Sequence, residues 1–181
     1  MALRPADGAG KDRGPSLGQR RLALRLAEYG VVAVVLLLLI GGFLRKIERL
    51  QAQTERLTME RTVRAMRTAV ELAAILSADG QQRIPAALRP GGNPMDLLDQ
   101  VPANYRGTRA GIDPASVPGG HWYFDRQQGL LIYRVANPRF FATELPGPPR
   151  ARFRIVEQSQ EVSPHLALEP VEPYRWRVHP R

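Results

Sequence analysis

The sequence predicts an α+β protein in which one long N-terminal helix packs on a small antiparallel β-sheet. Three observations lead to this fold class. Residues 29–44 carry no formal charge, residues 43–78 contain neither Pro nor Gly, and short aromatic and β-branched segments follow residue 120. The first two features predict a helix that is membrane-spanning and then amphipathic, and the third predicts short strands.

The uncharged stretch Tyr29–Leu44 is the most apolar part of the chain and is bounded by Glu28 and Arg45. A helix of this length spans about 24 Å, and extension back to residue 20 brings it to the hydrocarbon thickness of about 30 Å. We therefore expect a transmembrane helix over residues 20–44, preceded by a disordered cytoplasmic tail over residues 1–19. A signal peptide would end in a small-residue cleavage site, whereas this run leads directly into a charged helical segment.

Residues 45–80 are expected to continue the anchor as an amphipathic helix. Its apolar residues recur at three- and four-residue steps on two faces. One face holds Ile47, Leu50, Thr54 and Leu57, and the other holds Met59, Val63, Met66, Val70 and Ala73. We expect this helix to cover one face of the sheet, because a meander of short strands needs such a cover. The alternative is a parallel coiled coil with another single-pass protein, although Arg61 and Arg64 occupy its next core positions.

Residues 81–120 are rich in Pro and Gly and are expected to form a loop with one short helix, capped by Asn93 with Pro94 in its first turn. Residues 121–181 are expected to form the antiparallel sheet. Its clearest signal is a hairpin of His121–Asp125 and Leu130–Val135, with Gly129 at the turn position that requires positive φ. Further short strands are predicted over residues 152–156, 166–168 and 174–178.

The composition argues against several classes of function. The net charge of +9 is spread along the chain and not concentrated in a stripe, so a nucleic-acid partner is not expected. Attraction to a lipid bilayer or to an acidic protein explains the positive charge equally well. The absence of cysteine excludes disulfides and thiolate metal sites. The three histidines are far apart in sequence, and no catalytic motif is present. We expect no catalytic residue, metal or cofactor, and therefore no enzyme.

Two pairs of segments resemble type IV pilins and type II secretion pseudopilins. Asn93–Leu98 with Pro102–Gly107 is similar to the loop and short helix of pilin-like proteins, and Pro118–Asp125 with Gly129–Val135 is similar to their first hairpin. With the apolar-then-amphipathic helix, the resemblance covers residues 22–135. The chain departs from the family at the N-terminus, because residues 20–28 contain no Gly-Phe junction for the prepilin peptidase.

The resemblance implies a pilin-like fold and a structural or assembly role in a type II secretion or type IV pilus system. The partners would be other membrane or pilin-like proteins of that apparatus. It also implies a bacterial inner-membrane location with a periplasmic C-terminal domain. Charge alone does not set this orientation, since basic residues flank the span equally on both sides. The alternative is a single-pass membrane interaction or sensor protein unrelated to pilins.

Glu28 is the candidate site residue, and two interpretations of it stay open. It pairs with Arg21 or Arg25 on its own helix, or it is an intramembrane assembly contact with a basic group of a neighbouring subunit. The second interpretation follows from the resemblance, because Glu28 takes roughly the place of the pilin helix glutamate. An unpaired charge is costly within the membrane, so such a contact would fix the register between subunits.

Overall fold

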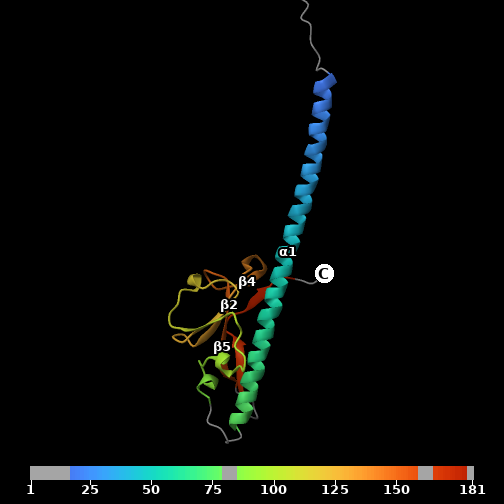
Figure 1. The fold of residues 1–181 in the computed structure, drawn as a ribbon. Helices are drawn as coiled ribbons and strands as arrows, with labels where there is room; N and C mark the ends of the chain where they lie inside the picture. Colours follow the sequence, from blue (N-terminus) through green and yellow to red (C-terminus); the bar gives the residue numbers. More distant parts are fainter. Residues whose placement is uncertain (1–16, 79–84, 159–164, 179–181) are drawn as a thin grey trace, which may run out of the picture. The chain divides into compact units, whose positions relative to one another are not determined.

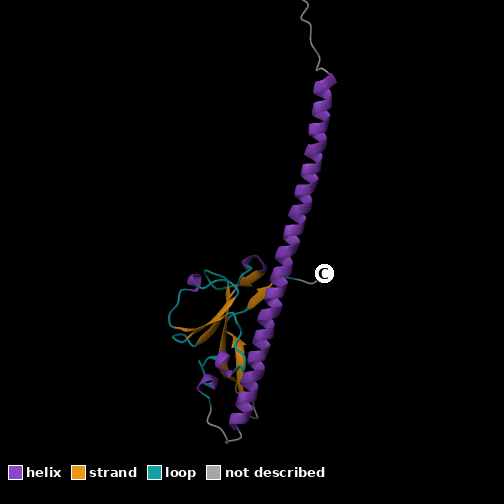
Figure 2. Cartoon of the chain, viewed as in Figure 1, coloured by secondary structure: helices purple, strands orange, loops and turns teal. Residues whose placement is uncertain are grey.

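The computed structural model describes residues 17–78, 85–158 and 165–178 and has an α+β fold (Figures 1 and 2). The elements are the helix α1 (Leu17–Ala78) and the strands β1 (Tyr105–Arg109), β2 (His121–Asp125), β3 (Leu130–Arg134), β4 (Phe141–Thr143), β5 (Arg150–Gln158), β6 (His165–Pro170) and β7 (Tyr174–Trp176). Four short 3₁₀ helices lie between them: η1 (Ala86–Leu88), η2 (Pro94–Leu97), η3 (Pro114–Ser116) and η4 (Pro138–Phe140). The chain divides into two units, residues up to Lys46 and residues from Ile47 onward, and α1 contributes to both.

In the first unit, α1 begins at Leu17, so the last residues of the expected tail are helical. Residues 1–16, which hold the rest of that tail, lie outside the described part. An 18-residue window of α1 has a mean hydropathy of 2.2, and none of its residues is buried. The helix is therefore long and apolar enough to cross a membrane.

In the second unit, α1 covers one face of the main sheet, as predicted. Its buried side chains are Ala52, Met59, Val63, Met66 and Val70. They recur at three-, four- and seven-residue spacings, which places them along one side of the helix. The other predicted face is not used in this packing, since Leu50 and Leu57 remain half exposed.

The main sheet has five strands in the order β1-β2-β3-β5-β6, and β4 pairs with β7 in a separate two-stranded sheet. The predicted hairpin is present as β2 and β3, with Trp122 opposite Tyr133. Its turn contains Gly129 at φ +64°, as expected. β3 pairs with β5 and β5 with β6, also antiparallel.

The expectation of a purely antiparallel sheet is wrong, because β1 pairs with β2 in parallel and the sheet is mixed. β1 also lies within residues 81–120, which were expected to hold only a loop and a short helix. Parallel neighbours need a crossover of about a dozen residues, and residues 110–120 provide it. The short helix of that region is present as η2, where the Asn93 side chain accepts a hydrogen bond from the Met95 amide.

The crossover lies on the face of the sheet opposite α1. Side chains alternate along a strand, so Trp122 and Phe124 point toward α1 while Tyr123 points away from it. Tyr123 forms a small second cluster with Val117 of the crossover and with Leu130 and Ile132 of β3. Both faces of β2 and β3 are therefore covered, which explains why these strands are buried along nearly their whole length.

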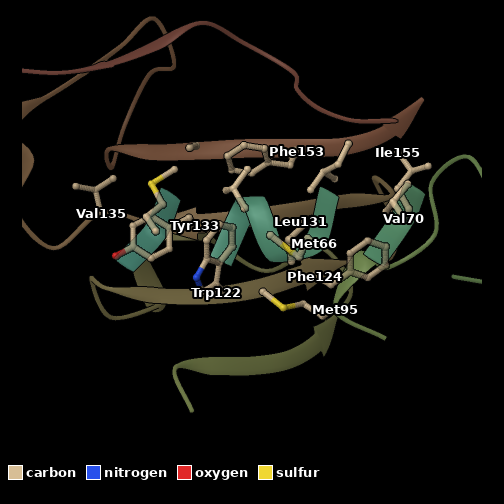
Figure 3. Close-up of a cluster of buried hydrophobic side chains, with 14 of the residues drawn as sticks. Met66, Val70, Met95, Trp122, Phe124, Leu131, Tyr133, Val135, Phe153 and Ile155 are labelled. Atoms are coloured by element: carbon tan, nitrogen blue, oxygen red, sulfur yellow. The ribbon is translucent and has the colours of Figure 1, made fainter. Parts of the chain in front are cut away.

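The main core gathers residues from α1, the central strands and η2 (Figure 3). Trp122 lies at its centre, with ring centroids 4.7 Å from Tyr133 and 5.8 Å from Phe153. Met66 of α1 and Met95 of η2 are fully buried in the same cluster. These flexible side chains fill the space between a helix and a twisted sheet.

Candidate functional site

Glu28, the predicted site residue, lies on α1 with an exposed side chain. It immediately precedes Tyr29, which is 69% exposed. The side chains of Arg21 and Arg25 lie outside the described part of the chain, so the pairing of Glu28 stays a prediction in both of its forms.

The run that follows Glu28 is an exposed apolar surface on every side of the helix. Its large side chains are each between 49% and 71% exposed: Val31, Val32, Val34, Val35, Leu36, Leu37, Leu38, Leu39, Ile40, Phe43 and Leu44. Apolar area in contact with water costs about 25 cal/mol per Å². A continuous surface of this kind marks a membrane or protein contact, and its lack of a polar side is typical of lipid.

The most connected polar side chain in the described structure is Glu55 of α1. Its Oε1 accepts hydrogen bonds from the Tyr133 phenol at 3.0 Å and the Ala136 amide at 2.6 Å. Its Oε2 accepts hydrogen bonds from the Asn137 amide at 3.0 Å and the Asn137 side chain at 2.7 Å. One carboxylate thus joins the helix to the end of β3 and the turn that follows it.

This contact changes the acid–base behaviour of Tyr133. Burial raises the pKa of the Tyr133 phenol, and the adjacent negative charge of Glu55 raises it further. The phenol therefore stays a hydrogen-bond donor over the physiological range. This contact could not be predicted from the sequence, because Glu55 is one of several charged residues on the helix and its partners are about 80 positions away.

Two buried polar residues organise the loops at the edge of the sheet. Asn93 caps η2 and donates from Nδ2 to Asp96 at 2.7 Å and to the Tyr105 hydroxyl at 3.0 Å. Asp125, at the end of β2, accepts hydrogen bonds from the backbone amides of Gly111, Gln127 and Gln128. The Asn93 amide is hydrogen-bonded through both its oxygen and its nitrogen, and Asp125 Oδ1 accepts all three amide bonds, so both side chains hold local turns in place.

Arginines occupy the outer face of β5, where Arg150, Arg152 and Arg154 alternate with core residues. Arg152 forms a two-point ion pair with Glu172. Burial lowers the pKa of Arg152, and the neighbouring Arg150 and Arg154 lower it further. Arg150 donates to the carbonyls of Pro146 and Pro148, so it holds the preceding turn rather than facing an empty site.

The aromatic side chains that a single-stranded nucleic acid would need for stacking are mostly in the core. Trp122, Tyr123, Tyr133, Phe141, Phe153 and Trp176 are buried. They are therefore not placed to stack on bases beside the arginines of β5.

The histidines give no metal-binding arrangement within the described residues. His121 Nε2 lies 2.9 Å from an Arg106 nitrogen, and its Nδ1 lies 2.9 Å from the Gly119 carbonyl. The side chain of His165 and all of His179 lie outside the described part. No group of three or more His, Asp or Glu side chains among the described residues is arranged to hold a metal ion.

Comparisons with known proteins identify no relative of this chain. No family model, curated protein or solved structure matches the chain. Function is therefore inferred from the exposed run after Glu28 and from the helix-covered sheet.

Proposed function

We propose that this chain is a membrane-anchored, pilin-like structural component of a type II secretion or type IV pilus system. It acts through protein–protein contacts and not as an enzyme. Its anchor lies in a bacterial inner membrane, and its folded domain lies in the periplasm. The observation that carries the proposal is α1 itself, which holds an exposed apolar run and also supplies the core-forming helix of an α+β unit.

Further support comes from the chain segments that resemble pilins. The Asn93-capped η2 and the β2–β3 hairpin are ordered elements of one core. A short capped helix followed by a hairpin, both beside a long helix, is the arrangement that the resemblance implies. The parallel strand β1 is an addition that the resemblance did not predict.

The alternative is a single-pass interaction or sensor protein unrelated to pilins. The absence of a Gly-Phe junction in residues 20–28 favours it. A pilin-like protein that keeps its anchor and is not cleaved reconciles this absence with the resemblance. Mass spectrometry of the mature N-terminus separates the forms: the proposal expects residues before Arg20 to be retained, whereas a new methylated terminus would indicate a filament subunit.

The role in an apparatus is tested by deletion and complementation in the source organism. We expect deletion to lower secretion or surface piliation at least tenfold and the wild-type gene to restore it. Glu28→Leu should fail to restore it if Glu28 pairs with a neighbouring subunit. Glu71→Leu is the matched control, because Glu71 is an exposed carboxylate of the same helix in the second unit. Unchanged secretion and piliation on deletion would contradict the proposal.

A further inference from the structure

In the second unit, α1 has a second apolar face that packs against nothing in the described chain. Its large side chains are Leu50 (52% exposed), Leu57 (50%), Leu72 (55%), Ile75 (68%) and Leu76 (50%). At about 100° per residue, they lie on the side of the helix that faces away from the sheet. A solvated helix would normally carry charged residues here, so this outer face is suited to a further contact.

The smaller residues of the outer face are compatible with a dry contact. The Thr54 hydroxyl donates to the Leu50 carbonyl at 3.0 Å, so it needs no water when covered. Ala65 and Thr68 continue the face toward Leu72 and leave room for close approach of another backbone.

Hollows border the outer face near both ends. One of about 530 Å³ is lined by Thr68, Leu72 and Leu76 together with Leu97 of η2 and the following Leu98 and Asp99. The other, of about 290 Å³, is lined by Gln53, Arg56, Leu57 and Val178. Each has enough volume for apolar side chains from a second helix.

The outer face carries two arginines near its midpoint, Arg61 and Arg64, and of these only Arg64 is approached by a carboxylate among the described ion pairs. Positions 57, 58, 64 and 65 hold no acidic residue, so Arg61 has no carboxylate at helical spacing. The adjacent Glu60 is engaged by Arg56 at 2.7 Å and approached by Arg64 at 4.0 Å. None of the ion pairs in the described chain includes Arg61.

The position of Arg61 disfavours a second copy of this chain as the partner. Residue 61 is close to the centre of the outer face, which runs from residue 50 to residue 76. Two copies paired either in parallel register or antiparallel would therefore place Arg61 opposite Arg61. Like charges at such a position oppose association, whereas a carboxylate there would favour it.

We propose that the outer face of α1 binds an amphipathic helix of a different membrane-anchored protein, whose apolar stripe is interrupted by one carboxylate that pairs with Arg61. The inference rests on the proposed function and specifies the chemistry of its partner. Apolar contact supplies the attraction, and the single ion pair sets register and excludes self-pairing.

The test supplies the complementary charge from a variant of the same chain. Full-length proteins are reconstituted in liposomes, each labelled on one cysteine introduced by Arg126→Cys, which is unique because the chain has none. Energy transfer then reports association in three mixtures: wild type alone, Arg61→Glu alone, and the two together. We expect the mixed pair to associate at least tenfold more tightly than either protein alone, with the gain reduced by salt.

Two controls identify the face. Arg49→Glu makes the same charge change about 120° around the helix, and it should give no gain with wild type. Adding Leu57→Gln to the Arg61→Glu chain should remove the gain. Equal association in all three mixtures overturns the proposal, and so does wild-type self-association that matches the mixed pair, which would identify a second copy as the partner. Failure of the protein to float with the liposomes would instead contradict the membrane anchor on which the proposed function depends.

Discussion

The Glu55 carboxylate on α1 accepts a hydrogen bond from the Tyr133 phenol on β3, over an oxygen–oxygen distance of 3.0 Å. The same carboxylate accepts hydrogen bonds from the backbone amides of Ala136 and Asn137. It therefore fixes the helix to one end of the sheet by polar contacts, in addition to the apolar core between them. Hydrogen bonds to a charged group are typically worth about 1.5–3 kcal/mol each.

We expect Glu55→Gln to lower the free energy of unfolding by about 2 kcal/mol, because an amide nitrogen must then face hydrogen-bond donors. Tyr133→Phe should cost about 1 kcal/mol, and the double variant should show a coupling energy of at least about 0.5 kcal/mol. Denaturant unfolding in detergent, followed by tryptophan fluorescence, measures this, because Trp122 and Trp176 are both buried in the folded unit. If the two losses of unfolding free energy were strictly additive, the hydrogen bond between Glu55 and Tyr133 would be contradicted.

The raised pKa of Tyr133 predicts a loss of stability at alkaline pH. Its folded pKa lies above the unfolded value of about 10. The stabilisation is therefore fully present below pH 10 and is lost as pH rises, because the unfolded state releases the proton first. Tyr133→Phe should reduce the fall in unfolding free energy above pH 10 by up to about 1.4 kcal/mol per pH unit. If the unfolding free energy of the variant fell with pH as steeply as that of the wild type, the folded state would not raise the pKa of the Tyr133 phenol.

The two faces of α1 should respond differently to truncation. Met66 is fully buried against the sheet, so Met66→Ala is expected to cost about 2–5 kcal/mol. Leu57 is 50% exposed, and Leu57→Ala should change the free energy of unfolding by less than about 0.5 kcal/mol. Thermal or denaturant unfolding of both variants decides the orientation of the helix. A larger loss for Leu57→Ala would mean that the opposite face covers the sheet.

The β2–β3 turn depends on Gly129 for two separate reasons. Its φ of +64° strains any other residue, and an added Cβ would stand 3.0 Å from the Gly91 Cα. Gly107 has a φ of +79° with nothing within 4 Å of an added Cβ, so it isolates the backbone effect. We expect Gly107→Ala to cost about 1 kcal/mol and Gly129→Ala about 2–3 kcal/mol. Equal losses in unfolding experiments would argue against the close approach to Gly91.

Local signals made the β2–β3 hairpin and the capped η2 predictable from the sequence. Aromatic and β-branched residues with a glycine at the turn indicate a hairpin, and Asn followed by Pro indicates a helix start. The stripe around Met59 and Met66 was one of two apolar faces recognised in the sequence, and the structure shows that it is the one that covers the sheet. In each case the residues that carry the signal are close together in the chain.

The features that could not be predicted depend on distant partners. β1 was missed because Tyr-Arg-Gly-Thr-Arg contains a single large apolar residue and a glycine at positive φ. Its parallel pairing is set by the crossover that follows it and not by its own residues. The role of Glu55 was missed for the same reason. The sequence does not distinguish a helical carboxylate that faces water from one that binds a turn about 80 residues away.

We propose that α1 anchors this chain permanently in a bilayer. Alkaline carbonate extraction of membranes from cells that express the full-length protein is the decisive test. We expect the protein to stay in the membrane pellet, and a variant carrying Leu37→Glu and Leu38→Glu to shift to the supernatant. Release of the wild-type protein by carbonate would show that it is not held in the bilayer.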